Sequence, residues 1–307
     1  MAEFLETVSK FAVLVFVVAC MATAGLGLNR RDLIAPLRDA RLIGFALLAN
    51  FVVAPGLAYG LTEVFPLEKP YSIGLLLLGS AAGAPFLPKL AELARGDVAF
   101  SVGLMLVLMI GSVVFMPIVL PRLIPGSSPE PWPLLKPLLF TMLLPLAAGM
   151  IVKSVSDDWS SRLRPVVAAV SNASLVVALI LLIALNFRAM LGTFGSGAVA
   201  IGVAFVSLSL SAGYALGGSA LRTRSVLGVG TGQRNIAAAL LIATESFPEE
   251  AGVVVMLLVT TFAGLVVLLA AAAWFARITE KAAATGSPRD SASPQLRPEP
   301  VADESKQ

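Results

Sequence analysis

Gly228-Val229-Gly230-Thr231-Gly232-Gln233-Arg234-Asn235 interrupts a long apolar stretch of this chain with three glycines and a Gln-Arg-Asn triplet. Each glycine weakens a helix by about 1 kcal/mol, and an arginine near the middle of a bilayer costs at least about 2.5 kcal/mol. A membrane segment that contains both is expected to keep unwound backbone inside the protein or along a water-filled cavity. Secondary transporters build binding sites from such segments.

The composition indicates a polytopic helical membrane protein. Of the 307 residues, 57% are hydrophobic and only 13% are charged, whereas soluble domains carry about 25% charged residues. The charges that give the net value of +3 lie in short loops, so orientation in a membrane explains them better than a nucleic-acid partner does. The chain has one cysteine and no histidine, which excludes an intrachain disulfide, a cysteine-based metal site and imidazole chemistry.

A helix needs about 20 apolar residues to span a bilayer, and about nine segments of the chain qualify. They are residues 11–28, 41–61, 71–94, 98–120, 134–152, 166–187, 197–220, 225–246 and 251–275. Residues 278–307 are rich in Pro, Ser, Ala and alternating charge. We therefore expect a membrane transporter domain over residues 1–277 and a disordered cytoplasmic tail over residues 278–307.

Basic residues concentrate on one side of these spans. That side holds Arg30, Arg31, Arg38, Arg41, Lys89, Arg95, Lys153, Arg162, Arg164, Arg222, Arg224, Arg277 and Lys281. The positive-inside rule places them in the cytoplasm. We expect a multi-pass protein of the cell (inner or plasma) membrane, with its N-terminus outside and its C-terminus in the cytoplasm.

Two predicted spans contain helix-breaking residues. In the span 71–94, Pro85 and Pro88 each remove a backbone donor, and Gly79 and Gly83 loosen the same region. The glycine-rich stretch quoted above interrupts a later span that enters from the opposite side. This arrangement predicts an inverted repeat with two discontinuous helices. Ordinary Pro and Gly kinks, which are common in membrane helices, are the alternative.

Arg234 lies about ten residues into its predicted span, which places it about 15 Å deep at 1.5 Å per residue. Its side chain cannot cover that distance to water, so the guanidinium needs an acceptor inside the protein. The sequence offers no carboxylate at that depth, but it does offer broken-helix carbonyls, Asn50 and Ser101. Two interpretations stay open: the guanidinium binds an anionic ligand such as a carboxylate or sulfonate, or it caps loose carbonyl groups.

Three parts of the chain resemble elements of the sodium/bile acid symporter family. Residues 25–28 (Gly-Leu-Gly-Leu) are similar to the family's GMGLT element. Residues 78–83 and 93–102 resemble the family's first broken helix and the A-(R/K)-G-(D/N)-x-A-x-S-V turn after it. Residues 232–235 lie where the family has its E-x-G-x-Q-N crossing motif. The resemblance covers about residues 11–277.

This resemblance implies an all-α polytopic membrane protein with an inverted repeat, two discontinuous crossing helices, and a panel and a core domain. The panel would consist of the spans near 11–28, 134–152 and 166–187, and the core of the spans near 41–61, 71–94, 98–120, 197–220, 225–246 and 251–275. The two domains would move against each other, with the crossing inside the core.

Most residues that the family uses to hold sodium are replaced here. Gly230 stands at the position of the motif glutamate and Arg234 at that of the motif glutamine, whereas Asn235 is retained. Leu87-Pro88 replaces a Ser-Asn pair in the first broken helix. Sodium needs several oxygen ligands, so this pattern puts sodium coupling in question. We interpret Arg234 as a tethered cation in place of a mobile one.

The candidate site residues come from the two broken helices and from this resemblance. Substrate contacts are expected at Asn50, Ser80, Ala84, Thr231, Gln233, Arg234 and Asn235, and ion contacts at Ser101, Asn50, Thr231 and Gln233. No catalytic residue and no metal site are expected. No cofactor is expected either, except that Na+ stays open.

The expected function is secondary active transport of a small organic anion through the lipid bilayer by alternating access. Alternatives are a sodium-coupled organic anion symporter with a rearranged ion site, and a non-transporting membrane sensor on the same fold. An enzyme is not expected, because the sequence offers no buried general base or paired acids.

Overall fold

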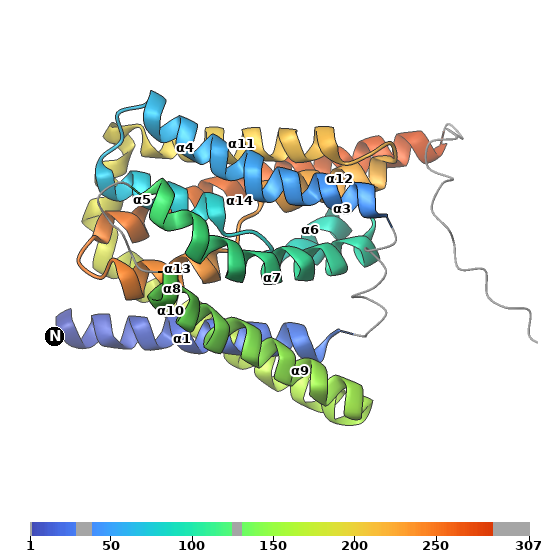
Figure 1. Cartoon of the computed structure of the whole chain (residues 1–307), viewed down its shortest axis with the longest axis horizontal. Coiled ribbons are helices and arrows are strands. Elements are labelled where there is room, and N and C mark those ends of the chain that lie inside the picture. Colours follow the sequence, from blue (N-terminus) through green and yellow to red (C-terminus); the bar gives the residue numbers. More distant parts are fainter. Residues whose placement is uncertain (1, 29–38, 125–130, 285–307) are drawn as a thin grey trace, which may run out of the picture.

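All regular structure in the described part of the chain is helical. The computed structural model describes residues 2–28, 39–124 and 131–284, and no strand occurs within these ranges. Eight helices in them are long and apolar enough to cross a bilayer. The predicted fold class, an all-α polytopic membrane protein, is confirmed, and Figure 1 shows most of these helices running along one common direction.

The helices follow the predicted spans in order. They are α1 (Ala2–Leu26), α3 (Ala40–Leu48), η2 (Ala49–Val53), α4 (Ala54–Val64), α5 (Lys69–Ser80), α6 (Leu87–Leu93), α7 (Val98–Leu123), α8 (Pro131–Leu138), η3 (Leu139–Leu143), α9 (Leu144–Val155), α10 (Asp157–Ser196), α11 (Ala198–Leu216), α12 (Leu221–Gly232), α13 (Ile236–Ser246) and α14 (Ala251–Ala284). The segments η2 and η3 are π-helical turns inside otherwise continuous helices.

Two predicted boundaries differ from the structure in an informative way. The span 71–94 is divided into α5 and α6, which have 12 and 7 residues and are too short to cross a bilayer alone. The helix α10 has 40 residues and extends beyond the predicted 166–187 at both ends. Hydropathy does not detect the polar first turns of a helix that projects beyond the apolar layer.

The predicted start of the tail is wrong. The helix α14 continues to Ala284, so residues 278–284 are helical although we expected disorder from residue 278. Their sequence, ITEKAAA, is rich in strong helix formers, which allows the helix to extend beyond the apolar layer. Residues 285–307, the rest of the predicted tail, lie outside the described residues.

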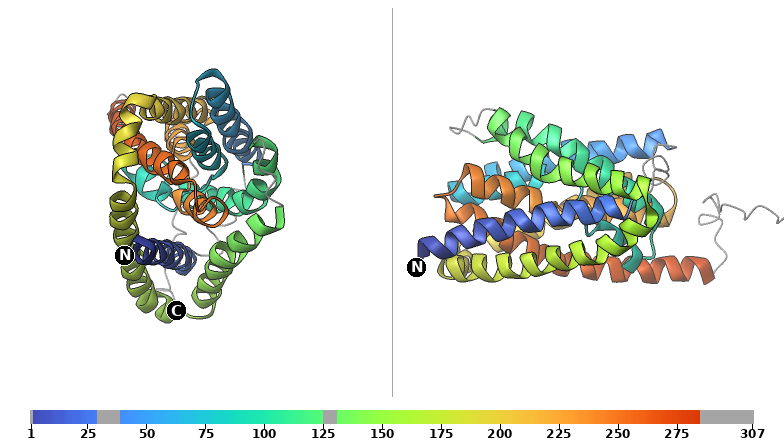
Figure 2. Two further views of the ribbon diagram at one scale, coloured as in Figure 1. Left: turned by 90° about the vertical axis from the view of Figure 1, so that its left-hand side faces the viewer. Right: turned by 90° about the horizontal axis from the view of Figure 1, so that it is seen from below.

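The helices form two groups. One group contains α1, α9 and α10, which pack on one another and lie together at the bottom of Figure 1. Gly149 of α9 allows the close approach to α1, because a Cβ there would lie 2.6 Å from the carbonyl oxygen of Ala22. The larger group contains α4, α5, α7, α11, α12 and α14, and Figure 2 shows it beside the first. The assignment of the helices to a panel and a core domain, and the relative motion of the two, stay predictions.

The second broken helix is the most enclosed of the eight spans. In the segment Leu221–Ser246, 89% of the apolar window is buried, against 17% in Asp157–Thr193. The glycine-rich stretch therefore lies inside the protein, whereas α10 lies at the periphery, where its apolar side chains face lipid.

Candidate functional site

The two helix breaks cross and bind each other. The chain leaves α5 at Ala81 with φ −90° and ψ 91° and leaves α12 at Gln233 with φ −82° and ψ 127°. The backbone N–H of Asn235 donates to the carbonyl of Ala81 at 2.8 Å, and its Nδ2 donates to the carbonyl of Gly83 at 3.2 Å. The prediction of two discontinuous crossing helices is therefore confirmed.

The unwound backbone of the first break is satisfied by a neighbouring helix. Ser112 of α7 accepts a hydrogen bond from the Ala82 N–H at 2.8 Å and donates to the Ala82 carbonyl at 3.0 Å. Gly83 has φ +77°, and a Cβ on it would lie 2.7 Å from the backbone of Leu108. Only glycine combines that conformation with such a close approach, so α7 holds the extended segment tightly.

The guanidinium of Arg234 lies at this crossing and is 6% exposed. It has five N–H donors, and all five are used. Nε donates to the carbonyl of Leu78 at 3.1 Å. Nη1 donates to Asn50 Oδ1 at 2.9 Å and to the Thr231 carbonyl at 3.3 Å. Nη2 donates to the Asn50 carbonyl at 3.3 Å and to the Gly79 carbonyl. Of the two interpretations from sequence, the geometry favours capping of loose carbonyls.

Three of these four carbonyls are free for a local reason. Gly79 and Thr231 lie in the last turns of α5 and α12, where carbonyls lack an intrahelical donor, whereas the Leu78 carbonyl also accepts from the Ala81 N–H at 3.2 Å. Asn50 lies in the π-helical turn η2, in which the Ala54 N–H donates to Ala49. The next residue that could donate to the Asn50 carbonyl is Pro55, which has no N–H. The local sequence thus leaves these carbonyl oxygens short of backbone donors, and the guanidinium of Arg234 donates to them instead.

Asn50 joins this cluster to the second span. It is fully buried, and its Nδ2 donates to the Ala46 carbonyl at 3.0 Å and to Thr231 Oγ1 at 3.2 Å. Its Oδ1 accepts from Arg234, so all polar atoms of the amide are engaged. Asn50, Thr231 and Arg234 therefore form one connected network.

The charge on Arg234 is balanced by dipoles and not by a carboxylate. The ion pairs found over residues 2–28, 39–124 and 131–284 are Lys89–Glu92, Arg95–Glu280 and Lys153–Asp157, all away from the crossing. The C-terminal ends of α5 and α12, which carry partial negative charge, both meet the guanidinium. The crossing is a buried, positively charged centre.

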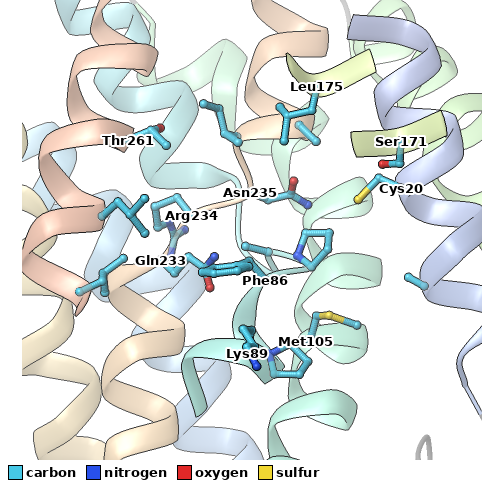
Figure 3. A pocket seen from close by; sticks show the side chains of 18 of the residues that line it. Cys20, Phe86, Lys89, Met105, Ser171, Leu175, Gln233, Arg234, Asn235 and Thr261 are labelled. Carbon is cyan, nitrogen blue, oxygen red and sulfur yellow. The ribbon is translucent and has the colours of Figure 1, made fainter. Parts of the chain in front are cut away.

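A cavity of about 750 Å³ lies between the two groups of helices and reaches the crossing. Residues of α1 and α10, such as Cys20, Ser171 and Leu175, form one wall, and Gln233 and Asn235 belong to the other (Figure 3). Phe86 and Lys89, from the turn before α6 and from α6 itself, and Met105 of α7 extend that second wall. The lining is mostly apolar, as is usual for organic ligands.

The cavity extends toward one side of the membrane. Its lining on α1 begins at Phe16 and continues past the C-terminal end of that helix to Leu28, and its lining on α10 runs from Arg164, near the N-terminal end, to Leu179 in the middle. Arg164 and Lys89 bring positive charge to that end. Arg164 packs on Gly27, since a Cβ on Gly27 would lie 3.0 Å from the guanidinium carbon.

Two polar atoms in the cavity wall have no protein partner. Gln233 Oε1 and Thr260 Oγ1 are buried without a hydrogen bond in the described part of the chain, and both residues line the cavity. Buried polar atoms ordinarily have partners. Because these two atoms are themselves buried, a molecule bound in the cavity could reach them only after the side chain turned toward it.

A sodium ion does not fit at the crossing as it stands. The neutral oxygens that would hold such an ion already bind the guanidinium of Arg234. The space beside Gly230 is filled by hydrocarbon, because a Cβ there would lie 3.2 Å from both methyl carbons of Leu87 and 3.8 Å from Leu104 Cδ2. Neither place offers a free set of oxygen ligands.

The structure separates the predicted site residues into three sets. Ala84, Gln233, Arg234 and Asn235 line the cavity, whereas Asn50 and Thr231 lie behind them on Arg234. Ser80 is buried with an unpartnered hydroxyl and lies off the cavity wall. Ser101 donates to the Val98 carbonyl of its own helix and does not line the cavity. Their roles in binding stay predictions.

Sequence reasoning did not single out Ser112, Phe86 or Thr260. The only signal for Ser112 is a lone hydroxyl in a very apolar helix, and serine in such a helix usually bonds its own backbone. Phe86 follows the helix-breaking Pro85, which marks the segment without marking the side chain. Nothing in the sequence distinguishes Thr260 from an ordinary packing residue.

Comparison with known proteins is consistent with this architecture. The model of the Sodium Bile acid symporter family matches residues 13–193. Two chloroplastic proteins of Arabidopsis thaliana are similar: the probable sodium/metabolite cotransporter BASS3, 23% identical over 63% of this chain and 45% of its own length, and BASS6, 24% identical over 75% and 59%. The uncharacterized sodium-dependent transporter YocS of Bacillus subtilis is 28% identical over 45% of this chain and 44% of its own length. The chain thus spans about half the length of these relatives.

Proposed function

The chain belongs to the Sodium Bile acid symporter family, and we propose that this secondary transporter carries a small organic anion by alternating access. The observation that supports the proposal best is the cavity of about 750 Å³ that reaches a buried, unpaired arginine charge. A carboxylate or sulfonate placed in a dry site near that charge gains strongly from it, although the donors of Arg234 are engaged by the protein.

The substrate is expected to combine an anionic group with an apolar body. The cavity walls include Phe16, Phe86, Leu175 and Leu265, which suit hydrocarbon or a ring system. Gln233 lines the cavity and its Oε1 is buried without a donor, so rotation of this side chain would present an acceptor to a hydroxyl or N–H on the substrate. Conjugated lipophilic acids and short carboxylic acids both meet this description, and cations do not.

Alternating access would consist of movement between the panel helices α1, α9 and α10 and the core helices. The cavity lies between these two groups and extends to the end where α1 stops and α10 begins. Lys89 and Arg164, two of the basic residues predicted to face the cytoplasm, line the cavity toward that end, so we infer a conformation that opens to the cytoplasm. An inverted repeat would relate this state to one that opens outward.

The test is uptake into proteoliposomes that contain the purified full chain. A panel of labelled organic anions should include one whose uptake is saturable and is inhibited by unlabelled anion and not by an organic cation. The variant Ala84→Phe should abolish uptake, because Ala84 is 5% exposed and lines the cavity. The control Ala273→Phe changes an exposed residue of α14 outside the cavity lining and should leave uptake intact.

Two alternatives have distinct outcomes in this assay. The names of BASS3, BASS6 and YocS describe sodium-dependent or sodium-coupled transport, which favours a sodium-coupled symporter with a rearranged ion site; uptake would then require a sodium gradient. A sensor would bind anions, seen as an increase in thermal stability, without any flux. Saturable flux of an organic anion without sodium is the result expected from our proposal.

A further inference from the structure

We propose that the crossing of the two broken helices is a cation site that Arg234 fills permanently, so that this transporter needs no coupling ion there. The part of this inference that concerns ion coupling rests on the proposed transport function. The part that concerns the site itself does not, because occupancy of the site can be measured without any substrate.

The atoms around the guanidinium are those of an ion site. Five neutral oxygens converge on it: the carbonyls of Leu78, Gly79, Asn50 and Thr231, and the Asn50 side-chain oxygen. They come from three separate segments: the end of α5, the turn η2 and the end of α12. Unwound carbonyls and helix C-terminal ends are the groups with which transporters hold monovalent cations.

The electrostatics also require a cation at this place. Two negative helix ends and a buried amide oxygen converge in a buried region. Without a positive partner these oxygens, apart from the Leu78 carbonyl that also accepts from the Ala81 N–H, would be buried and unsatisfied, a state that proteins avoid. The guanidinium provides that charge through a covalent tether, since Arg234 belongs to the link between α12 and α13.

A mobile ion beside Arg234 is disfavoured for two reasons. All five oxygens already accept from the guanidinium, and a second positive charge at contact distance would be repelled in a low-dielectric interior. The neighbouring space at Gly230 is filled by the methyl groups of Leu87. The positive charge therefore stays with the core in every state of the cycle and is available to the anion throughout.

The decisive experiment removes the tethered cation and offers a mobile one. The purified full-length variant Arg234→Gln is prepared in NaCl, and its thermal unfolding midpoint is measured in NaCl and in N-methylglucamine chloride at equal ionic strength. We expect the midpoint of the variant to rise saturably with Na+, because a bound ligand stabilises the folded state that holds it. The wild-type midpoint should be the same in both salts.

Two further variants serve as controls. Arg234→Lys keeps a tethered positive charge and should remain insensitive to Na+. Arg224→Gln removes a half-buried arginine outside the crossing, whose Nε donates to the Tyr214 carbonyl at 3.2 Å, and should show no Na+ effect.

The inference is overturned if Arg234→Gln gains no sodium-specific stabilisation, or if the wild-type protein is itself stabilised saturably by Na+. If Arg234→Gln does not fold even in NaCl, the wild-type titration and anion uptake with and without sodium decide: indifference to sodium supports the inference and dependence overturns it. Absence of anion flux together with a sodium site in Arg234→Gln would instead reject the proposed function alone.

Discussion

The replacement Ser112→Ala tests how the first helix break is maintained. Ser112 is 1% exposed and makes both hydrogen bonds of Ala82, whose N–H and carbonyl lie in extended backbone. The variant leaves these two buried groups without a partner, and each such loss costs about 1–3 kcal/mol. We therefore expect the free energy of unfolding to fall by about 2–6 kcal/mol, with little change in volume to offset it.

The measurement is the thermal unfolding midpoint in detergent, with Ser211→Ala as the matched control. Ser211 is exposed and donates only to the Ser207 carbonyl of its own helix, so its removal should change stability by no more than about 0.5 kcal/mol. At about 2 °C per kcal/mol, Ser112→Ala should lower the midpoint by at least about 4 °C. A midpoint equal to that of Ser211→Ala would refute the assignment of Ser112 as the partner of the break.

Two further predictions concern the cavity mouth and the turn η2. Arg164→Gln should raise the KM for an anionic substrate about fivefold at low salt, because a contact between unit charges in water contributes about 1 kcal/mol. The increase in KM should be smaller at high salt. An equal increase in Arg162→Gln, which changes a residue outside the cavity lining, would contradict this. Removal of a proline from a helix interior ordinarily raises the free energy of unfolding by about 3 kcal/mol. Pro55→Ala should not give this increase, because the new N–H competes with Arg234 for backbone carbonyls. A full gain in the unfolding midpoint, equal to or above that of Pro117→Ala in α7, would refute that role of Pro55.

Hydropathy and helix-breaking residues predicted most of the architecture. The apolar segments located the spans, and Gly79, Gly83 and Pro85 located the first break, because each acts on the local backbone. The break covers residues 81–86 and so begins four residues before Pro85, and Pro88 falls in the first turn of α6, where a missing N–H costs nothing. A proline therefore indicates that a helix break is near, but it does not show at which residue the break begins.

Helix ends outside the apolar layer could not be predicted in the same way. The first turns of α10 contain Asp157, Asp158 and Arg164, and the end of α14 contains Glu280 and Lys281. These residues lower the hydropathy although they favour a helix in water, where propensity and side-chain pairs decide. Composition alone cannot separate such an extension from a loop.

The sequence predicted that Arg234 has acceptors inside the protein, but it did not predict which carbonyls bind it. Its depth demanded interior acceptors, and Asn50 was among the candidates because amides are rare at that depth. Four of its five hydrogen bonds go to backbone carbonyls, which have no signature in the sequence. The π-helical turn at Asn50 depends on Pro55, whose effect on a carbonyl five residues earlier is visible only once the helix register is known.

The residues at the crossing that differ from the family motif change the fixed charge at this place. The resemblance to the family places a glutamate with a bound sodium where this chain has Gly230 with Arg234, so a locally neutral pair is replaced by one net positive charge. Leu87 fills the space beside Gly230, and the helix ends bind the guanidinium. A fixed charge cannot leave during the cycle, so it cannot couple uphill transport to an ion gradient. A transporter built in this way should equilibrate or exchange anions, and its direction should follow the gradients of the anions themselves.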